Sequence, residues 1–129
     1  MNTPANLKYA KTDEWVKLNG KIATVGITDY AQNQLSDIVF VELAKEVGDS
    51  VNKGDAIATI ESVKAAAEVN AQVSGKVIAI NETLSVTPEI LNDDPYEGGW
   101  MYQIEITSET DLNDLMEASA YSTFCEGRH

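Results

Sequence analysis

The chain has 129 residues, of which 43% are hydrophobic and 23% are charged, a composition typical of globular rather than disordered proteins. Its 21 Asp and Glu against 9 Lys and Arg give a formal net charge of −12. A field of that sign repels nucleic-acid phosphates and anionic membrane surfaces. We therefore expect neither a nucleic-acid-binding nor a membrane-binding role, and the length suits one domain over residues 1–129.

Few residues in the chain could do conventional enzyme chemistry. Cys125 is the only cysteine and His129 the only histidine, so an internal disulfide and a Cys/His zinc site are excluded. A histidine base or serine triad is difficult with one histidine at the chain end, and there is no phosphate-binding Gly-rich loop. We expect no catalytic residues and no metal. Residues 1–6 lack a signal or transit pattern, so a cytoplasmic location is expected.

Strands dominate the predicted elements. Apolar and polar residues alternate over Glu14–Leu18 and Lys21–Thr28, and the Asn19-Gly20 pair between them is a strong hairpin signal. A short helix is predicted over Asp29–Leu35, with Thr28 or Asp29 as its N-cap. The remaining strands are predicted at Ile38–Leu43, Ala56–Ser62, Ala66–Gln72, Lys76–Asn81 and Trp100–Thr107.

The last third of the chain adds a loop and a helix. Thr87–Gly99 contains two prolines, two glycines and four acidic residues and is predicted as a long loop. Asp111–Phe124 is predicted as a helix, since its apolar residues recur at spacings of three and four. The fold class expected is mainly β, a flattened antiparallel barrel or sandwich with these two helices.

The segment from Ile60 to Val69 is predicted as a hairpin whose reversal contains no Gly, Pro, Asn or Asp. A type I turn tolerates such residues. With Lys64 and Ala65 at its centre, the facing pairs are Val63–Ala66, Ser62–Ala67 and Glu61–Glu68. Facing carboxylates are destabilising, unless Lys64 folds between them or a partner uses the acidic rim. The pattern alone makes Lys64 a solvated lysine at a loop tip.

The hexapeptide Glu61-Ser62-Val63-Lys64-Ala65-Ala66 resembles the lipoylation motif of glycine cleavage H-proteins, in which the lysine carries lipoate as an amide. The resemblance extends in order over about residues 8–121. It includes Lys11–Val16, Val25–Gln32, Leu35–Leu43, Val73–Val77, Asn81–Leu84, Asn92–Tyr96 and Gly98–Trp100. The chain departs from the family at Asp13, usually His, at Ser36, often Gly, and at Glu97, where Gly is common. Ser122–His129 does not obviously extend the likeness.

The resemblance implies a lipoyl/biotinyl-like barrel-sandwich hybrid that is a cofactor carrier and not an enzyme. Lys64 would bear the lipoyl group, with Glu61, Ser62, Val63 and Ala65 as motif neighbours. The partners implied are glycine decarboxylase with pyridoxal phosphate, an aminomethyltransferase with tetrahydrofolate, dihydrolipoamide dehydrogenase and a lipoate-attaching enzyme. The carrier itself is expected to be a monomer.

The cargo between the first two enzymes would be a labile aminomethyl group that needs protection from water. Because an amine bound there is cationic, carboxylates are its natural partners. Glu14 and Glu68 occupy family-matched positions where acidic residues could line a protecting cleft. The alternative is that both are surface acids among many.

Four other functions are compatible with the sequence. A biotinyl or lipoyl domain of another multienzyme system usually has Met or Asp before the lysine, where this chain has Val63, and would leave the N-terminal blocks and C-terminal helix unexplained. An H-like protein that relays lipoyl groups to other enzymes is a second alternative. A carboxylate-based hydrolase and an acidic structural β-domain without cofactor are the third and fourth.

Overall fold

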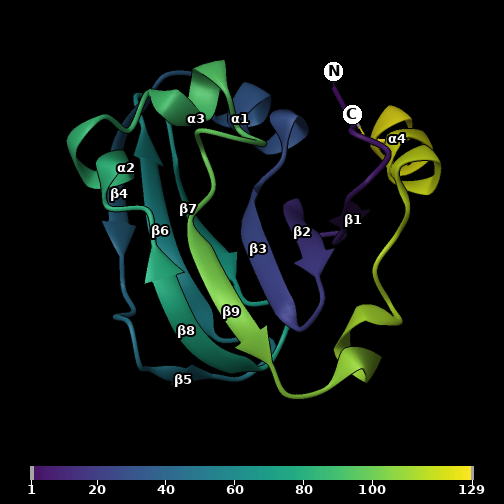
Figure 1. Cartoon of the computed structure of the whole chain (residues 1–129). Helices are drawn as coiled ribbons and strands as arrows, with labels where there is room; N and C mark the ends of the chain where they lie inside the picture. Colours follow the sequence, from purple (N-terminus) through teal and green to yellow (C-terminus); the bar gives the residue numbers. More distant parts are fainter. Residues whose placement is uncertain (1, 129) are drawn as a thin grey trace.

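The computed structural model describes residues 2–128, which fold as two antiparallel sheets with short helices at their ends (Figure 1). The larger sheet has the order β1 (Lys8–Tyr9), β2 (Glu14–Asn19), β3 (Ile22–Ile27), β9 (Tyr102–Ile106), β8 (Gly75–Ile80) and β5 (Ser50–Val51). The smaller sheet has the order β4 (Ile38–Leu43), β6 (Ala56–Ser62) and β7 (Ala66–Asn70). The predicted mainly β antiparallel sandwich is confirmed, and the described strands close into no barrel.

Two of the predicted local elements form as expected. Asn19 pairs with Ile22 across the β2–β3 turn, where Gly20 has a φ of 63° that costs a residue without Cβ little. Helix α1 (Asp29–Leu35) begins at Thr28, whose hydroxyl accepts a hydrogen bond from the Ala31 amide at 3.1 Å. The Thr28 side chain therefore caps the N-terminus of α1, as Thr commonly does.

A hydrophobic core fills the space between the two sheets. Alternate residues of the strands point inward, as the period of two requires. The buried side chains include Val16, Val25, Val41, Ile60, Val69, Val77 and Ile104. No helix within residues 2–128 is long and apolar enough to cross a membrane.

A second, aromatic cluster attaches the C-terminal helix α4 (Ala118–Glu126) to the edge of the larger sheet beside β1 (Figure 1). Tyr121 of α4 stacks on Tyr9, with ring centroids 4.7 Å apart, and the buried Cys125 packs in the same cluster. Trp15 lies beneath, against Gly26, where a Cβ would stand 2.8 Å from the indole. Helix α4 is therefore packed against the rest of the fold.

The C-terminal helix begins later than predicted. Residues Glu109–Leu112 form a 3₁₀-helix, and α4 starts only at Ala118. Between them the Met116 backbone exchanges two hydrogen bonds with Tyr9, at 2.7 and 2.8 Å. A residue whose amide and carbonyl pair with a strand cannot also pair along a helix, so the helix predicted over 111–124 is interrupted.

The other corrections concern short elements. Thr87–Gly99 is not entirely loop, because it contains α3 (Ile90–Asp93), and α2 (Thr83–Val86) precedes it. The Asn92 side chain accepts from the Ile38 amide at 2.9 Å and donates to the Ser36 carbonyl at 2.8 Å. The Asn92 side chain therefore links α3 to the start of β4 through hydrogen bonds. Strands β1 and β5, of two residues each, were not predicted.

Candidate functional site

Lys64 lies at the apex of the turn between β6 and β7. The Ser62 amide donates to the Ala65 carbonyl at 2.8 Å, so the turn spans four residues with Val63 and Lys64 at its centre. The Ser62 hydroxyl also accepts from the Ala65 amide at 3.0 Å. Such a serine side chain stabilises a turn that lacks the usual Gly, Pro or Asn. The Val63 amide donates to the Asp37 carbonyl at 3.0 Å, which fixes the turn to the segment before β4.

The predicted register of this hairpin is wrong by two residues. The observed pairs are Glu61–Ala66, Ile60–Ala67 and Thr59–Glu68, because the turn is centred on Val63 and Lys64 and not on Lys64 and Ala65. The two carboxylates therefore do not face each other. A shift of two leaves every side chain on its predicted face of the sheet, since the strand period is also two.

The side chain of Lys64 extends into solvent and has no ion-pair partner among residues 2–128. Its motif neighbours Glu61, Val63 and Ala65 are exposed around it. The structure therefore brings the predicted motif together at one tip with a rigid root and a free amino group.

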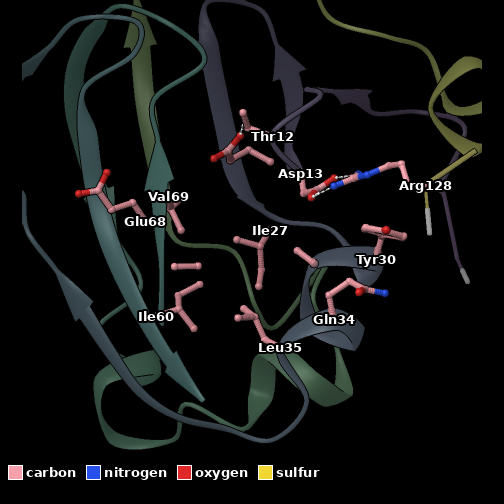
Figure 2. A pocket seen from close by; sticks show the side chains of 13 residues that line it. Thr12, Asp13, Ile27, Tyr30, Gln34, Leu35, Ile60, Glu68, Val69 and Arg128 are labelled. Atoms are coloured by element: carbon pink, nitrogen blue, oxygen red, sulfur yellow. Dashed lines mark hydrogen bonds and ion pairs between the residues drawn. The ribbon is translucent and has the colours of Figure 1, made fainter. Parts of the chain in front are cut away.

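A cleft of about 320 Å³ lies between the inner face of this hairpin and the elements opposite it. Its apolar lining includes Ile60 and Val69 from the hairpin, Ile27 from β3 and Leu35 from α1 (Figure 2). Polar groups stand along its walls: Thr12, Asp13, Glu14, Gln34, Glu68 and Arg128. An apolar floor with a few placed polar groups is the usual form of a small-molecule site.

Glu14 is the unusual residue of this cleft, because only 2% of it is exposed although it is a carboxylic acid. One carboxylate oxygen accepts from the Asn70 amide at 3.0 Å, and the other accepts from Gln72 Nε2 at 3.0 Å and from the Thr12 hydroxyl. All three donors are neutral. Burial, which these bonds offset only in part, raises the pKa of Glu14 from its ordinary 4.5 to about 7. A carboxylate in such a position gains by pairing with an incoming cation.

Glu68 and Glu14 line the same cleft but from different elements, β7 and β2. Glu68 is exposed, and Figure 2 shows its carboxylate directed away from the Asp13–Arg128 pair on the other side of the cleft. Of the two predicted carboxylates, Glu14 therefore lies inside the cleft and Glu68 at its rim.

Two wall residues were not predicted as part of the site. Asp13 and Arg128 form a bidentate ion pair, with nitrogen–oxygen distances of 2.6 and 2.9 Å. The departure from the family at Asp13 was the only sequence signal for either. Nothing in the sequence relates it to Arg128, which is 115 positions away.

Comparison with known proteins agrees with this architecture. The family model described as glycine cleavage H-protein matches residues 7–128. A glycine cleavage system H protein of Thermotoga maritima is 52% identical over 118 residues, covering 92% of this chain and 94% of that one. That of Staphylococcus saprophyticus is 51% identical over 122 residues, covering 95% and 96%.

A solved structure agrees in three dimensions. The crystal structure of a glycine cleavage system H protein from Mycobacterium marinum superposes with a TM-score of 0.86 at 31% identity, covering 95% of this chain and 98% of that one. Sequence and fold match over almost the full length of both chains. The chain therefore belongs to the glycine cleavage H-protein family.

Proposed function

We propose that the chain, as one domain over residues 1–129, is a carrier whose Lys64 bears a lipoyl group in amide linkage. The observation that carries the proposal is the placement of Lys64, which is exposed at the apex of a fixed turn and has no ion-pair partner among residues 2–128, on the hairpin whose Ile60 and Val69 line an apolar cleft. An accessible lysine amine suits amide formation, and the apolar lining formed by Ile60, Val69 and Leu35 suits a hydrocarbon arm. The residues present thus fit the group.

The lipoyl group, this chain and the enzymes that it visits have different tasks in the reaction. When bound, the lipoyl group supplies a redox-active disulfide that accepts a one-carbon amine and two electrons. The hairpin holds the lysine root, and tethering raises the effective concentration of the arm at each docked enzyme. The cleft excludes water from a guest. The chain contributes position and protection, and the bond-making groups belong to the enzymes it visits.

The family and the charge of the chain support a set of partners. In glycine cleavage we propose that it receives an aminomethyl group from glycine decarboxylase, which uses pyridoxal phosphate. It delivers the carbon to an aminomethyltransferase that uses tetrahydrofolate, and is reoxidised by dihydrolipoamide dehydrogenase. A lipoate-attaching enzyme loads it first. The net charge of −12 favours encounter with basic docking faces on these enzymes.

The test is the intact mass of the chain after incubation with lipoate, ATP and a lipoate ligase. The wild type should gain one lipoyl increment, and Lys64→Arg should gain none. Lys21→Arg, which alters another exposed lysine on the β2–β3 turn, serves as the matched control and should gain the increment. A folded wild type that gains no increment would refute the proposal, and a biotin ligase in parallel tests the related carrier class.

We propose further that Glu14, with Glu68 at the rim, holds the cationic amine of the cargo. The support is the burial of Glu14 among neutral donors, which leaves its charge without a cationic partner among residues 2–128. Replacing both with Gln should speed loss of the aminomethyl group from the loaded chain. The single variants show how much each carboxylate contributes to retention of the aminomethyl group. An unchanged decay rate in the double variant would refute this role.

A further inference from the structure

Arg128 is held at the wall of the cleft from several directions. Its guanidinium forms the bidentate pair with Asp13, lies 4.2 Å from the centroid of the Tyr30 ring and lies 4.9 Å from that of Phe124. The side chains of Arg128 and Asp13 are only 30% and 15% exposed. Bidentate and partly buried pairs of this kind are stronger than ordinary surface ion pairs, and stacking on aromatic faces adds to them.

Asp13 is held from a second side by a buried hydroxyl. Tyr121 of α4 donates to Asp13 Oδ1 at 2.8 Å, and the same hydroxyl is 2.7 Å from Thr28 Oγ1. Asp13 also has a φ of 74°, a left-handed conformation that Asp tolerates better than most residues. Its backbone carbonyl accepts from the Thr28 amide at 3.0 Å. This conformation is therefore fixed by contacts on both backbone and side chain.

The consequence concerns two neighbouring carboxylates. Asp13 and Glu14 are adjacent in the chain and line the same cleft, yet Asp13 pairs with a cation and Glu14 has only neutral donors. Figure 2 shows the Asp13 carboxylate directed toward the Arg128 guanidinium. Without Arg128, two negative charges would compete for any cation that enters.

We propose that Arg128 is a positioning residue that holds Asp13 in an ion pair on the wall, so that Glu14 remains the one inward carboxylate for a cationic amine guest. The idea rests on the proposed function for the identity of the guest, but the arrangement of charges can be measured without it. It also gives the C-terminal helix a role in the site. Arg128, which follows the end of that helix at Glu126, supplies the cation that neutralises Asp13, the acid next to Glu14.

The charged and titratable groups that line the cleft with Glu14 determine what removing Arg128 does. They come from the turn before β2, from β7, from α1 and from the segment after α4: Asp13, Glu68, Tyr30 and Arg128. Asp13 already contributes to the raised pKa of Glu14 by charge repulsion. Arg128→Gln would leave that charge uncompensated and should raise the proton affinity of Glu14 roughly two- to ten-fold, as expected for charges several ångströms apart under water-like screening.

The experiment is a pH titration of the side-chain carboxyl carbons by NMR, on the full chain without any modification. Arg128→Gln should raise the titration midpoint of Glu14, and Arg128→Lys should restore it in part. The double variant Asp13→Asn/Arg128→Gln, which removes both charges, should return it near the wild-type value. Lys8→Gln is the matched control, because it removes one positive charge from the exposed pair with Glu117 and should leave Glu14 unchanged.

The sign of the change separates positioning from a merely structural role. If Arg128 only fastens α4, its loss opens the cleft, hydrates Glu14 and lowers the midpoint toward 4.5. A lowered or unchanged midpoint in Arg128→Gln therefore overturns the proposal.

The loaded chain provides a second readout. In Arg128→Gln, the pH at which cargo retention becomes half-maximal should rise by as many pH units as the titration midpoint of Glu14, and the double variant should restore it. An unmoved retention profile, in a chain whose retention does depend on Glu14, counts against the proposal. Failure of the carrier function itself is seen separately, as a missing lipoyl increment on the wild type.

Discussion

Replacing Glu14 with Gln should change how stability depends on pH. In the folded chain the pKa of Glu14 is raised from 4.5 to about 7 by burial, whereas an unfolded chain restores the ordinary value. Between these pH values the folded state binds more protons than the unfolded state, so stability falls as pH rises. The difference corresponds to about 3 kcal/mol at about 1.4 kcal/mol per pKa unit. This destabilisation is absent below pH 4 and complete above pH 8.

The Gln variant cannot ionise, so it lacks this pH-dependent part. It does carry a fixed cost, because a Gln amide nitrogen must face one of the donors now bonded to the carboxylate, and a mismatched buried group costs about 1–3 kcal/mol. The fixed cost is the same at every pH. The stability of Glu14→Gln relative to wild type should therefore rise by about 3 kcal/mol from pH 4 to pH 8, whatever its starting value.

Urea unfolding followed by tryptophan fluorescence measures this difference, since Trp15 is completely buried in the folded chain. Subtracting the two proteins at each pH cancels the other carboxylates, which both share. Glu105→Gln is a suitable control, because Glu105 lies exposed on β9. A relative stability of Glu14→Gln that stays constant across the pH range would refute the idea that Glu14 is held in an unfavourable ionised state.

Three further substitutions test how the scaffold supports the site. Gly75→Ala should destabilise the chain by about 3 kcal/mol in urea unfolding, because its Cβ would lie 2.0 Å from the Glu105 carbonyl oxygen. Ser36→Gly should raise the melting temperature by the equivalent of about 1 kcal/mol, since Ser36 has φ 65° and ψ −148°; an unchanged value would contradict strain there. Ser62→Ala should speed hydrogen exchange of the Ala65 amide about five-fold for a lost bond of about 1 kcal/mol, with global stability as the control.

The sequence predicts those elements whose determinants lie within a few residues of one another. The β2–β3 hairpin follows from Asn19-Gly20, and α1 begins at Thr28 because a hydroxyl there can cap its own helix. The hairpin that carries Lys64 was predicted with its faces correct and its register wrong. Strand alternation fixes the face, but the turn position depends on a hydrogen bond that the Ser62 hydroxyl accepts from the Ala65 amide, and no standard turn residue indicates it.

Some features of the site likewise followed from the sequence, whereas others appeared only in the tertiary structure. The resemblance of residues 61–66 to a lipoylation motif was enough to single out Lys64. The exposure of Lys64 follows from its place at a turn. Only the tertiary structure showed that Glu14 is buried among neutral donors, that Glu68 lies at the rim, and that Met116 pairs with Tyr9 and delays α4. It alone brought Arg128 to Asp13. Local patterns determine local backbone shape, whereas burial and charge pairing depend on which distant segments the closed fold places together.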